Sequence, residues 1–278
     1  MAWFVIRMSW EGICVSSNAD KIYKQYAGQP EDKRDARSRH DWLEFHYTKQ
    51  HLEGLITKED RILEIGCATG YYGWYYADRC REYVGVDLFP AHIARFRQEI
   101  EEQGLSHLSC EIGDATHLDC LSDGSFDAVL SLGPMYHLPT EEREAAFAES
   151  ARVCKTGGVL AFAYIVPLGT YAGACVREDL RQLYPNAKAN DYVLNRGTDD
   201  VQPDLFHFVM PEEMEEAAKR HGLSKIKNLG TNFDFAMKVV NDMTDEQFAL
   251  MRPLYDRMAN CESCTGLAGH ALLVCRKD

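Results

Sequence analysis

The sequence predicts an α/β fold in which helices cover both faces of a doubly wound, mostly parallel sheet. Three observations support this: short apolar segments that end in an acidic residue, two glycines directly after the first of them, and helical patterns between successive segments. The 278 residues suit one domain with additions better than two full domains. We therefore expect one core sheet with extra segments attached.

The first strand is expected at residues 61–65, a buried apolar run. Gly66 and Gly70 follow it and allow the backbone to turn sharply and to pass close to a ligand. Residues 71–79 have a helical pattern, so the N–H groups of the turn and of the helix start would face a bound molecule, as at nucleotide sites of open α/β sheets. A small-molecule ligand is predicted at this turn.

Further strands follow at regular intervals. The second ends at Asp87, about twenty residues after the glycine turn, where dinucleotide-binding folds hold a ribose diol. The third contains another acid, Asp114. The strands after the first are expected at residues 83–87, 111–115, 126–132, 157–164, 225–229 and 270–275.

Helices are expected between these strands because capping and breaking residues bracket amphipathic patterns. Pro253 lies inside the last helical pattern and should break or kink it. The expected starts and ends are marked by Pro90 and Gly104, Thr140 and Gly157, Pro211 and Gly222, and the capping box that begins at Thr244.

Additions flank the core. Residues 1–56 are expected to be an N-terminal region, in which a disordered or loosely docked leader (residues 1–19) precedes a helical extension. Residues 57–278 form the main domain. Within it, the segment at about 167–210 is too long for a plain connection and carries many aromatic residues, which predicts a lid. Residues 233–260 are expected to be a helical insertion before the last strand.

In the order and spacing of these segments, residues 61–164 resemble the class I S-adenosylmethionine-dependent methyltransferases, small-molecule type. The resemblance implies a seven-stranded sheet of order 3-2-1-4-5-7-6 with the last strand antiparallel. It implies S-adenosylmethionine as cofactor and S-adenosylhomocysteine as product. The middle glycine of the family's turn is Ala68 here, whose methyl group is a small intrusion that the turn should tolerate.

The resemblance also assigns roles to residues of this chain. The glycine turn would cradle the methionine end of the cofactor, Asp87 would take the ribose hydroxyls, and Asp114 with Ala115 would meet the adenine. Glu64 would lie near the cofactor's ammonium group. The cofactor-binding candidates are Glu64, Gly66, Cys67, Ala68, Gly70, Asp87, Leu88, Asp114, Ala115 and Leu132.

Transfer of a methyl group from a sulfonium requires an acceptor lone pair in line behind the carbon, so the protein contributes mainly positioning and desolvation, and no metal is needed. Tyr136 and His137 follow the fourth strand and are expected near the methyl group. His137 could deprotonate an acceptor hydroxyl, thiol or ammonium, or could instead cap a helix or bind a backbone carbonyl. His207 is a second candidate base, and a nucleophilic acceptor would need none.

A small-molecule acceptor is favoured over nucleic acid. The net charge of −13 repels polyanions, and residues 132–135 lack the Asn/Asp-Pro-Pro-aromatic segment of the family's adenine and amide N-methylases. Aromatic residues of the predicted lid favour an apolar or ring-containing acceptor. Aromatic side chains of the N-terminal extension could line the pocket or be ordinary packing residues; these are Tyr23, Tyr26, His40 and Tyr47.

Other functions stay open at this point. A nicotinamide oxidoreductase would need glycine at positions 68 and 71, which hold Ala68 and Tyr71. A methyltransferase that acts on protein or RNA, or a protein that binds the cofactor without turnover, is a third alternative, which a groove in place of a closed pocket would favour.

The cysteines and the hydropathy pattern bear on the compartment. The ten cysteines form no disulfide framework, which indicates a reducing, cytoplasmic environment. Cys261 and Cys264 have metal-ligand spacing, but no second pair accompanies them, so zinc would lack ligands. No apolar run approaches the roughly twenty residues of a membrane span, so no membrane association is expected.

Overall fold

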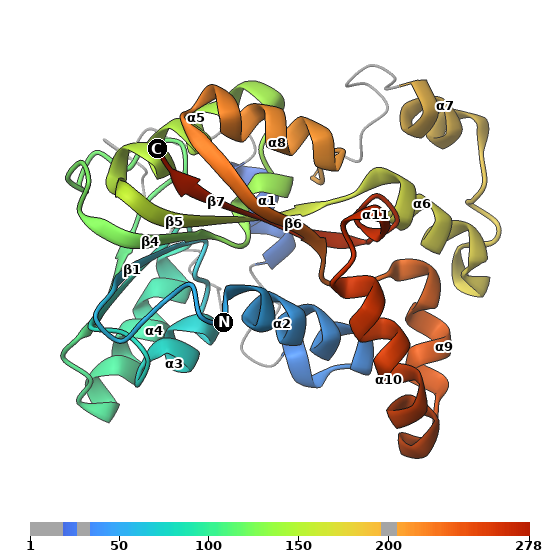
Figure 1. Ribbon diagram of the computed structural model, residues 1–278, viewed down its shortest axis with the longest axis horizontal. Helices are drawn as coiled ribbons and strands as arrows, with labels where there is room; N and C mark the ends of the chain where they lie inside the picture. Colours follow the sequence, from blue (N-terminus) through green and yellow to red (C-terminus); the bar gives the residue numbers. More distant parts are fainter. Residues whose placement is uncertain (1–18, 27–33, 196–204) are drawn as a thin grey trace, which may run out of the picture.

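The computed structural model describes residues 19–26, 34–195 and 205–278 (Figure 1). The leader predicted for residues 1–19 lies outside these ranges except for its last residue. Among the described residues, no helix is both long enough and apolar enough to span a bilayer.

A seven-stranded sheet forms the centre of the fold, in the order β3-β2-β1-β4-β5-β7-β6. β7 pairs in the antiparallel sense with both β5 and β6, and the other pairs are parallel. The predicted topology is confirmed. The strands are β1 (Arg61–Ile65), β2 (Glu82–Asp87), β3 (Leu108–Ile112), β4 (Phe126–Ser131), β5 (Cys154–Ile165), β6 (Leu223–Gly230) and β7 (His270–Lys277).

The third strand begins and ends earlier than predicted. It pairs with β2 from Leu108, opposite Tyr83, to Ile112, opposite Asp87. Because β2 ends at Asp87, residues beyond Ile112 have no strand to pair with, and the expectation of a strand over residues 111–115 is wrong. Asp114 therefore lies in the loop after β3, at the carboxyl edge of the sheet.

Helices lie on both faces of the sheet (Figure 1). α5 and α8 cover one face, and α3 and α4 cover the other. α5 begins at Thr140 with Pro139 as its N-cap, one residue before the predicted cap. These helices are α3 (Tyr71–Tyr76), α4 (Pro90–Gln103), α5 (Thr140–Val153) and α8 (Pro211–Arg220).

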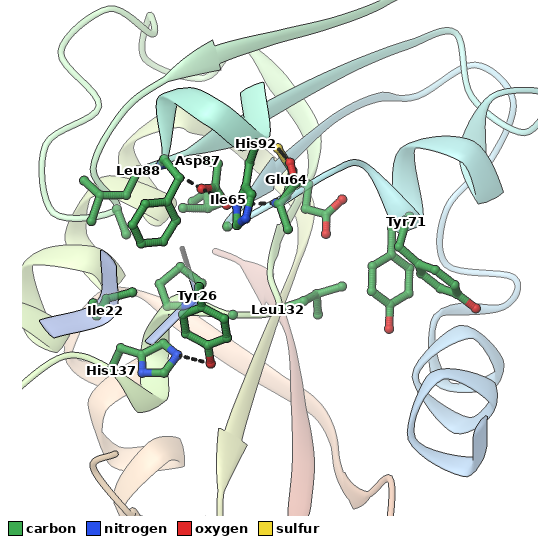
Figure 2. A pocket seen from close by; sticks show the side chains of 18 of the residues that line it. Ile22, Tyr26, Glu64, Ile65, Tyr71, Asp87, Leu88, His92, Leu132 and His137 are labelled. Atoms are coloured by element: carbon green, nitrogen blue, oxygen red, sulfur yellow. Dashed lines mark hydrogen bonds and ion pairs between the residues drawn. The ribbon is translucent and has the colours of Figure 1, made fainter. Parts of the chain in front are cut away.

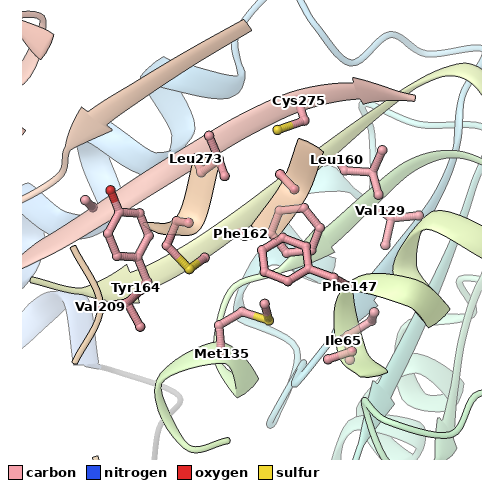
Figure 3. Close-up of a cluster of buried hydrophobic side chains, with 14 of the residues drawn as sticks. Ile65, Val129, Met135, Phe147, Leu160, Phe162, Tyr164, Val209, Leu273 and Cys275 are labelled. Carbon is pink, nitrogen blue, oxygen red and sulfur yellow. The ribbon is translucent and has the colours of Figure 1, made fainter. Parts of the chain in front are cut away.

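Aromatic side chains fill the core beneath α5 (Figure 3). The rings of Phe147, on α5, and Phe162, on β5, lie 4.4 Å apart between centroids, and both side chains are fully buried. Tyr164 donates a hydrogen bond from its buried hydroxyl to Asn228 Oδ1 on β6 (2.7 Å), which satisfies a polar group inside the core. This packing holds the neighbouring strands β5, β6 and β7 together.

The N-terminal region and the two insertions are helical. The predicted lid contains α6 and α7, and residues 196–204 of it lie outside the described residues. α10 continues past Pro253 to Ala259, so a break at this proline is wrong, and the alternative of a kink stays a prediction. The helices are α1 (Ala19–Tyr26), α2 (Arg39–Leu52), α6 (Pro167–Val176), α7 (Ala187–Asn195), α9 (Met237–Asp242), α10 (Asp245–Ala259) and α11 (Glu262–Thr265).

Candidate active site

A pocket of about 1060 Å³, including the space open to solvent, lies where β1, β2 and β4 end (Figure 2). α1, α2 and the turn before α2 contribute to its walls. Eleven of the twelve predicted site residues line this pocket: Glu64, Gly66, Cys67, Ala68, Asp87, Leu88, Asp114, Ala115, Leu132, Tyr136 and His137.

Gly70 is the predicted site residue that does not line the pocket. It caps the N-terminus of α3 with a left-handed backbone (φ +89°). A Cβ atom here would lie 2.2 Å from Cε2 of Phe96, on α4. Glycine is therefore required at this position for the turn and for helix packing.

The turn after β1 is held by backbone hydrogen bonds and by close packing. The N–H groups of Gly66 and Cys67 both donate to the carbonyl oxygen of Val86, at 2.7 and 3.1 Å. Gly66 is left-handed (φ +79°), and a Cβ atom there would lie 2.8 Å from Cδ of Pro134. Ala68 also takes a positive φ of 47°, which a residue with a methyl side chain adopts at a small energetic cost.

Asp87, at the end of β2, forms hydrogen bonds both to the turn after β1 and to the loop after β2. Its Oδ2 accepts a hydrogen bond from the N–H of Ala68 (2.8 Å), and its Oδ1 accepts one from the N–H of Phe89 (2.8 Å). His92 Nδ1 lies 3.4 Å from Oδ1. A carboxylate has about four acceptor positions, so Asp87 keeps acceptor capacity for hydroxyl groups in the pocket.

Asp114 is positioned in a similar way by the loop that follows β3. Its Oδ1 accepts hydrogen bonds from the N–H of Thr116 (2.8 Å) and from the hydroxyl of the same residue (2.7 Å). The side chain is buried and its loop faces the pocket. This contact orients the carboxylate without a neighbouring strand.

Glu64 is a buried carboxyl group at the floor of the pocket. Burial raises the pKa of Glu64 from 4.5 to about 8, against the hydrogen bond that its Oε2 accepts from the hydroxyl of Tyr83. The charge of Asp87 raises this pKa further. In the protein without ligand, Glu64 is therefore mostly protonated at neutral pH, and a cation in the pocket would favour its ionised form.

Replacement of Glu64 by glutamine tests this state. Because the pKa is higher in the folded protein, the folded state holds more protons than the unfolded state between pH 4.5 and about pH 8. The free energy of unfolding of the wild type therefore falls across this window, by up to about 5 kcal/mol relative to Glu64→Gln. Urea unfolding at pH 5 and pH 8, without cofactor, measures the difference; the exposed Glu101→Gln is the control. A constant difference between Glu64→Gln and the wild type would contradict the raised pKa.

Arg34 and Glu44 form an ion pair in the pocket wall that the sequence patterns did not identify. Burial opposes ionisation of Glu44, but the charges of Arg34, His270 and His40 outweigh it, so the pKa of Glu44 lies below its usual value. Glu44 lies on α2 and Arg34 on the short helical turn before it, and both line the pocket together with Tyr72. No short motif marks them, because Arg34 and Glu44 precede the first strand.

His137 and Tyr136 line the pocket from the segment that follows β4. The Nδ1 of His137 donates to the carbonyl oxygen of Leu205 (3.1 Å), and its Nε2 lies 3.1 Å from the hydroxyl of Tyr26. His137 thus binds a backbone carbonyl, which was one of the two expectations for this residue. Its Nε2 still faces the pocket (Figure 2). Burial lowers the pKa of His137 to about 4, so the ring is neutral at pH 7.

The remaining candidate residues differ in whether they line the pocket. Tyr26 lines the pocket, whereas His40 binds Asp234 and Tyr47 binds Asp256, both away from it. The side chain of Tyr23 lies outside the described part of the chain. His207 does not line the pocket, although its N–H donates to the carbonyl of Tyr136 (2.8 Å).

No described residue of the predicted lid lines the pocket, so the lid stays a prediction. Within the ranges that the structure describes, no group of three or more His, Cys, Asp or Glu side chains could hold a metal ion. The described cysteines, including Cys261 and Cys264, are free thiols.

Comparison with known proteins relates the first part of the sheet to a family. Residues 62–158 match the family model described as a methyltransferase domain. The match runs from β1 into β5. It supports S-adenosylmethionine as the cofactor.

The printed names of similar proteins differ in the acceptor. Erythromycin 3''-O-methyltransferase from Saccharopolyspora erythraea is 28% identical over 178 residues, which cover 57% of this chain and 56% of that protein. An 18S rRNA (guanine-N(7))-methyltransferase from Bos taurus is 30% identical over 138 residues, 46% of this chain and 47% of that protein. The chain thus spans about half the length of these curated relatives.

The crystal structure of the [4+2]-cyclase SpnF superimposes with a TM-score of 0.61 at 17% identity, covering 95% of this chain and 98% of that one. At this level of identity the likeness shows a shared fold alone.

Proposed function

We propose that this protein transfers a methyl group from S-adenosylmethionine to an O, N or S atom of a small-molecule acceptor. The observation that carries the proposal is the single pocket at the ends of β1, β2 and β4, which gathers eleven residues selected from the sequence. We propose two parts of the chain. Helices α1 and α2 of residues 1–56 line the pocket, and residues 57–278 would form the cofactor-binding domain.

The adenosine end of the cofactor would lie against the loops after β2 and β3. Asp87 retains acceptor capacity for the two ribose hydroxyls, and Asp114 with Ala115 would meet the adenine. Leu88 and Phe89 supply apolar surface beside them, as expected for a purine site.

The methionine end would lie between the glycine turn and α2. An α-amino acid carries a carboxylate and an ammonium group, and the Arg34–Glu44 pair offers one charge of opposite sign to each. Glu44 is ionised whereas Glu64 is mostly protonated, which favours Glu44 as the first partner of the ammonium group. Gly66 lines the pocket here, and the packing of Pro134 against its backbone leaves no room for a side chain at this position.

Arg34→Ala tests this assignment. We expect affinity for S-adenosylhomocysteine to fall by about ten- to a hundredfold, since a hydrogen bond to a charged group contributes about 1.5–3 kcal/mol. Isothermal titration calorimetry measures the change, with Arg37→Ala, an exposed neighbour, as the matched control. Wild-type affinity in Arg34→Ala would remove this arginine from the cofactor site.

The acceptor would occupy the end of the pocket near His137. Ile22 and Tyr26 of α1 line the pocket beside His137, which supports a pocket under helices over an open groove. Together with the net charge of −13, this favours a small molecule over RNA or a protein segment. His137, neutral at pH 7, is proposed as the base, and Tyr136 as its neighbour in the acceptor wall.

A metabolite screen tests the proposal. Purified protein is incubated with S-adenosylmethionine and metabolite pools, and mass spectrometry follows S-adenosylhomocysteine together with a matched methylated product. The expected result is a product that requires both protein and cofactor and is absent with Asp87→Ala. Methylation of RNA or protein fractions but of no small molecule would contradict the proposed acceptor class.

A further inference from the structure

His137 has a defined tautomer in this structure. A carbonyl oxygen only accepts hydrogen bonds, so Nδ1, 3.1 Å from the Leu205 oxygen, carries the ring proton. Because the ring is neutral, Nε2 holds a lone pair, and the partner 3.1 Å away is the hydroxyl of Tyr26. Tyr26 therefore donates its hydrogen to Nε2.

Tyr26 occupies the side of His137 that faces the cofactor cradle. Its ring lies 5.6 Å from the His137 ring and 6.5 Å from the ring of Phe89, which follows the ribose candidate Asp87. Figure 2 shows Tyr26 beside His137, on the side toward Ile65 and Asp87. The side chains of Ala19 and Ile22 are buried, so α1 packs against the rest of the domain. Because the Tyr26 hydroxyl occupies Nε2, a proton can reach this nitrogen through the Tyr26 oxygen.

We propose that Tyr26 is a catalytic residue that relays a proton from a hydroxyl acceptor to Nε2 of His137. This inference rests on the proposed function and names its acceptor class. The S–CH₃ bond of the cofactor breaks as the methyl group bonds to the acceptor oxygen. The acceptor proton passes to Oη of Tyr26 while the Tyr26 proton passes to Nε2, which leaves an imidazolium ion that returns its proton to solvent after product release.

The basicity of His137 suits a hydroxyl acceptor. A hydroxyl proton becomes strongly acidic as the oxygen gains the methyl group, so a weak base is sufficient. An alkylammonium acceptor must lose its proton before it can attack, and burial holds the pKa of His137 at about 4. That value lies roughly six pKa units below that of an alkylammonium, which makes this removal very unfavourable.

The first test needs no acceptor. Nitrogen NMR of protein labelled at the histidine ring nitrogens compares the wild type with Tyr26→Phe, and His137→Asn identifies the resonance. We expect the Nε2 resonance to move in Tyr26→Phe toward that of an imine nitrogen without a hydrogen bond. The control Tyr75→Phe, a tyrosine outside this pocket, should leave it unchanged. The same Nε2 resonance in the wild type and in Tyr26→Phe would overturn the pairing.

The second test uses the acceptor found by the metabolite screen. Tyr26→Phe should lower kcat by about 10–10²-fold with little change in the KM for S-adenosylmethionine. Tyr26→Phe combined with His137→Asn should be no slower than His137→Asn alone, since the two residues act in one relay. Additive losses, wild-type turnover of Tyr26→Phe, or an N- or S-methyl product would overturn the inference. Failure of the wild type to bind S-adenosylmethionine would instead overturn the proposed function.

Discussion

His137→Ala is expected to lower kcat by about 10²–10⁴-fold, the usual effect of removing a general base. The reason is that Nε2 of His137 carries a lone pair that can accept a proton. The acceptor reaches this nitrogen through the hydroxyl of Tyr26. Affinity for S-adenosylmethionine should stay near that of the wild type, because His137 is not among the proposed cofactor contacts. Initial rates with the screened acceptor, together with calorimetry of cofactor binding, measure both quantities.

His137→Asn controls for a structural role of this histidine. The asparagine amide can still donate to the Leu205 carbonyl, but it has no lone pair in the place of Nε2. Both variants should therefore lose turnover. Recovery of wild-type kcat in His137→Asn would show that His137 only supports the segment at Leu205 and is not the base.

Asp87→Ala is expected to weaken binding of S-adenosylmethionine by about 1–3 kcal/mol, roughly ten- to a hundredfold in Kd. The carboxylate would hold the ribose hydroxyls, and it also fixes the N–H groups of Ala68 and Phe89 on either side of the cofactor. Loss of the side chain thus removes a ligand contact and loosens two loops. Isothermal titration calorimetry measures Kd for the wild type and the variant.

Asp87→Asn separates the two effects. The amide oxygen can keep one of the loop contacts, so the fold around the turn should survive while recognition of the ribose diol weakens. Asp78→Ala, which removes a largely exposed carboxylate in the turn between α3 and β2, is the matched control and should bind as the wild type does. Unchanged affinity in Asp87→Ala would refute the ribose assignment.

Local chemistry explains why the cofactor loops could be located from the sequence. Gly66 is needed because its φ of +79° and the nearby Pro134 exclude a side chain, and Asp87 ends a strand whose apolar run is short and clear. The strand order, in contrast, came from the family resemblance. The end of β3 was placed three residues too late, because pairing with β2, and not the local pattern, determines where that strand stops.

The walls formed by α1 and α2 could not be derived in the same way. Arg34, Glu44 and Tyr26 reach the pocket only because their helices dock on distant parts of the chain. For α2, this docking uses contacts such as Tyr47 with Asp256 and His40 with Asp234, which are separated by about two hundred residues in the sequence. Aromatic spacing alone could not distinguish Tyr26, which lines the pocket, from Tyr47, which is buried in helix packing.

The occupant of the pocket is the central claim, and titration calorimetry of the wild type with S-adenosylmethionine and, separately, with NAD tests it most directly. We expect saturable binding of S-adenosylmethionine that competes with S-adenosylhomocysteine, and no heat of binding with NAD. Binding of NAD without binding of S-adenosylmethionine would contradict the account.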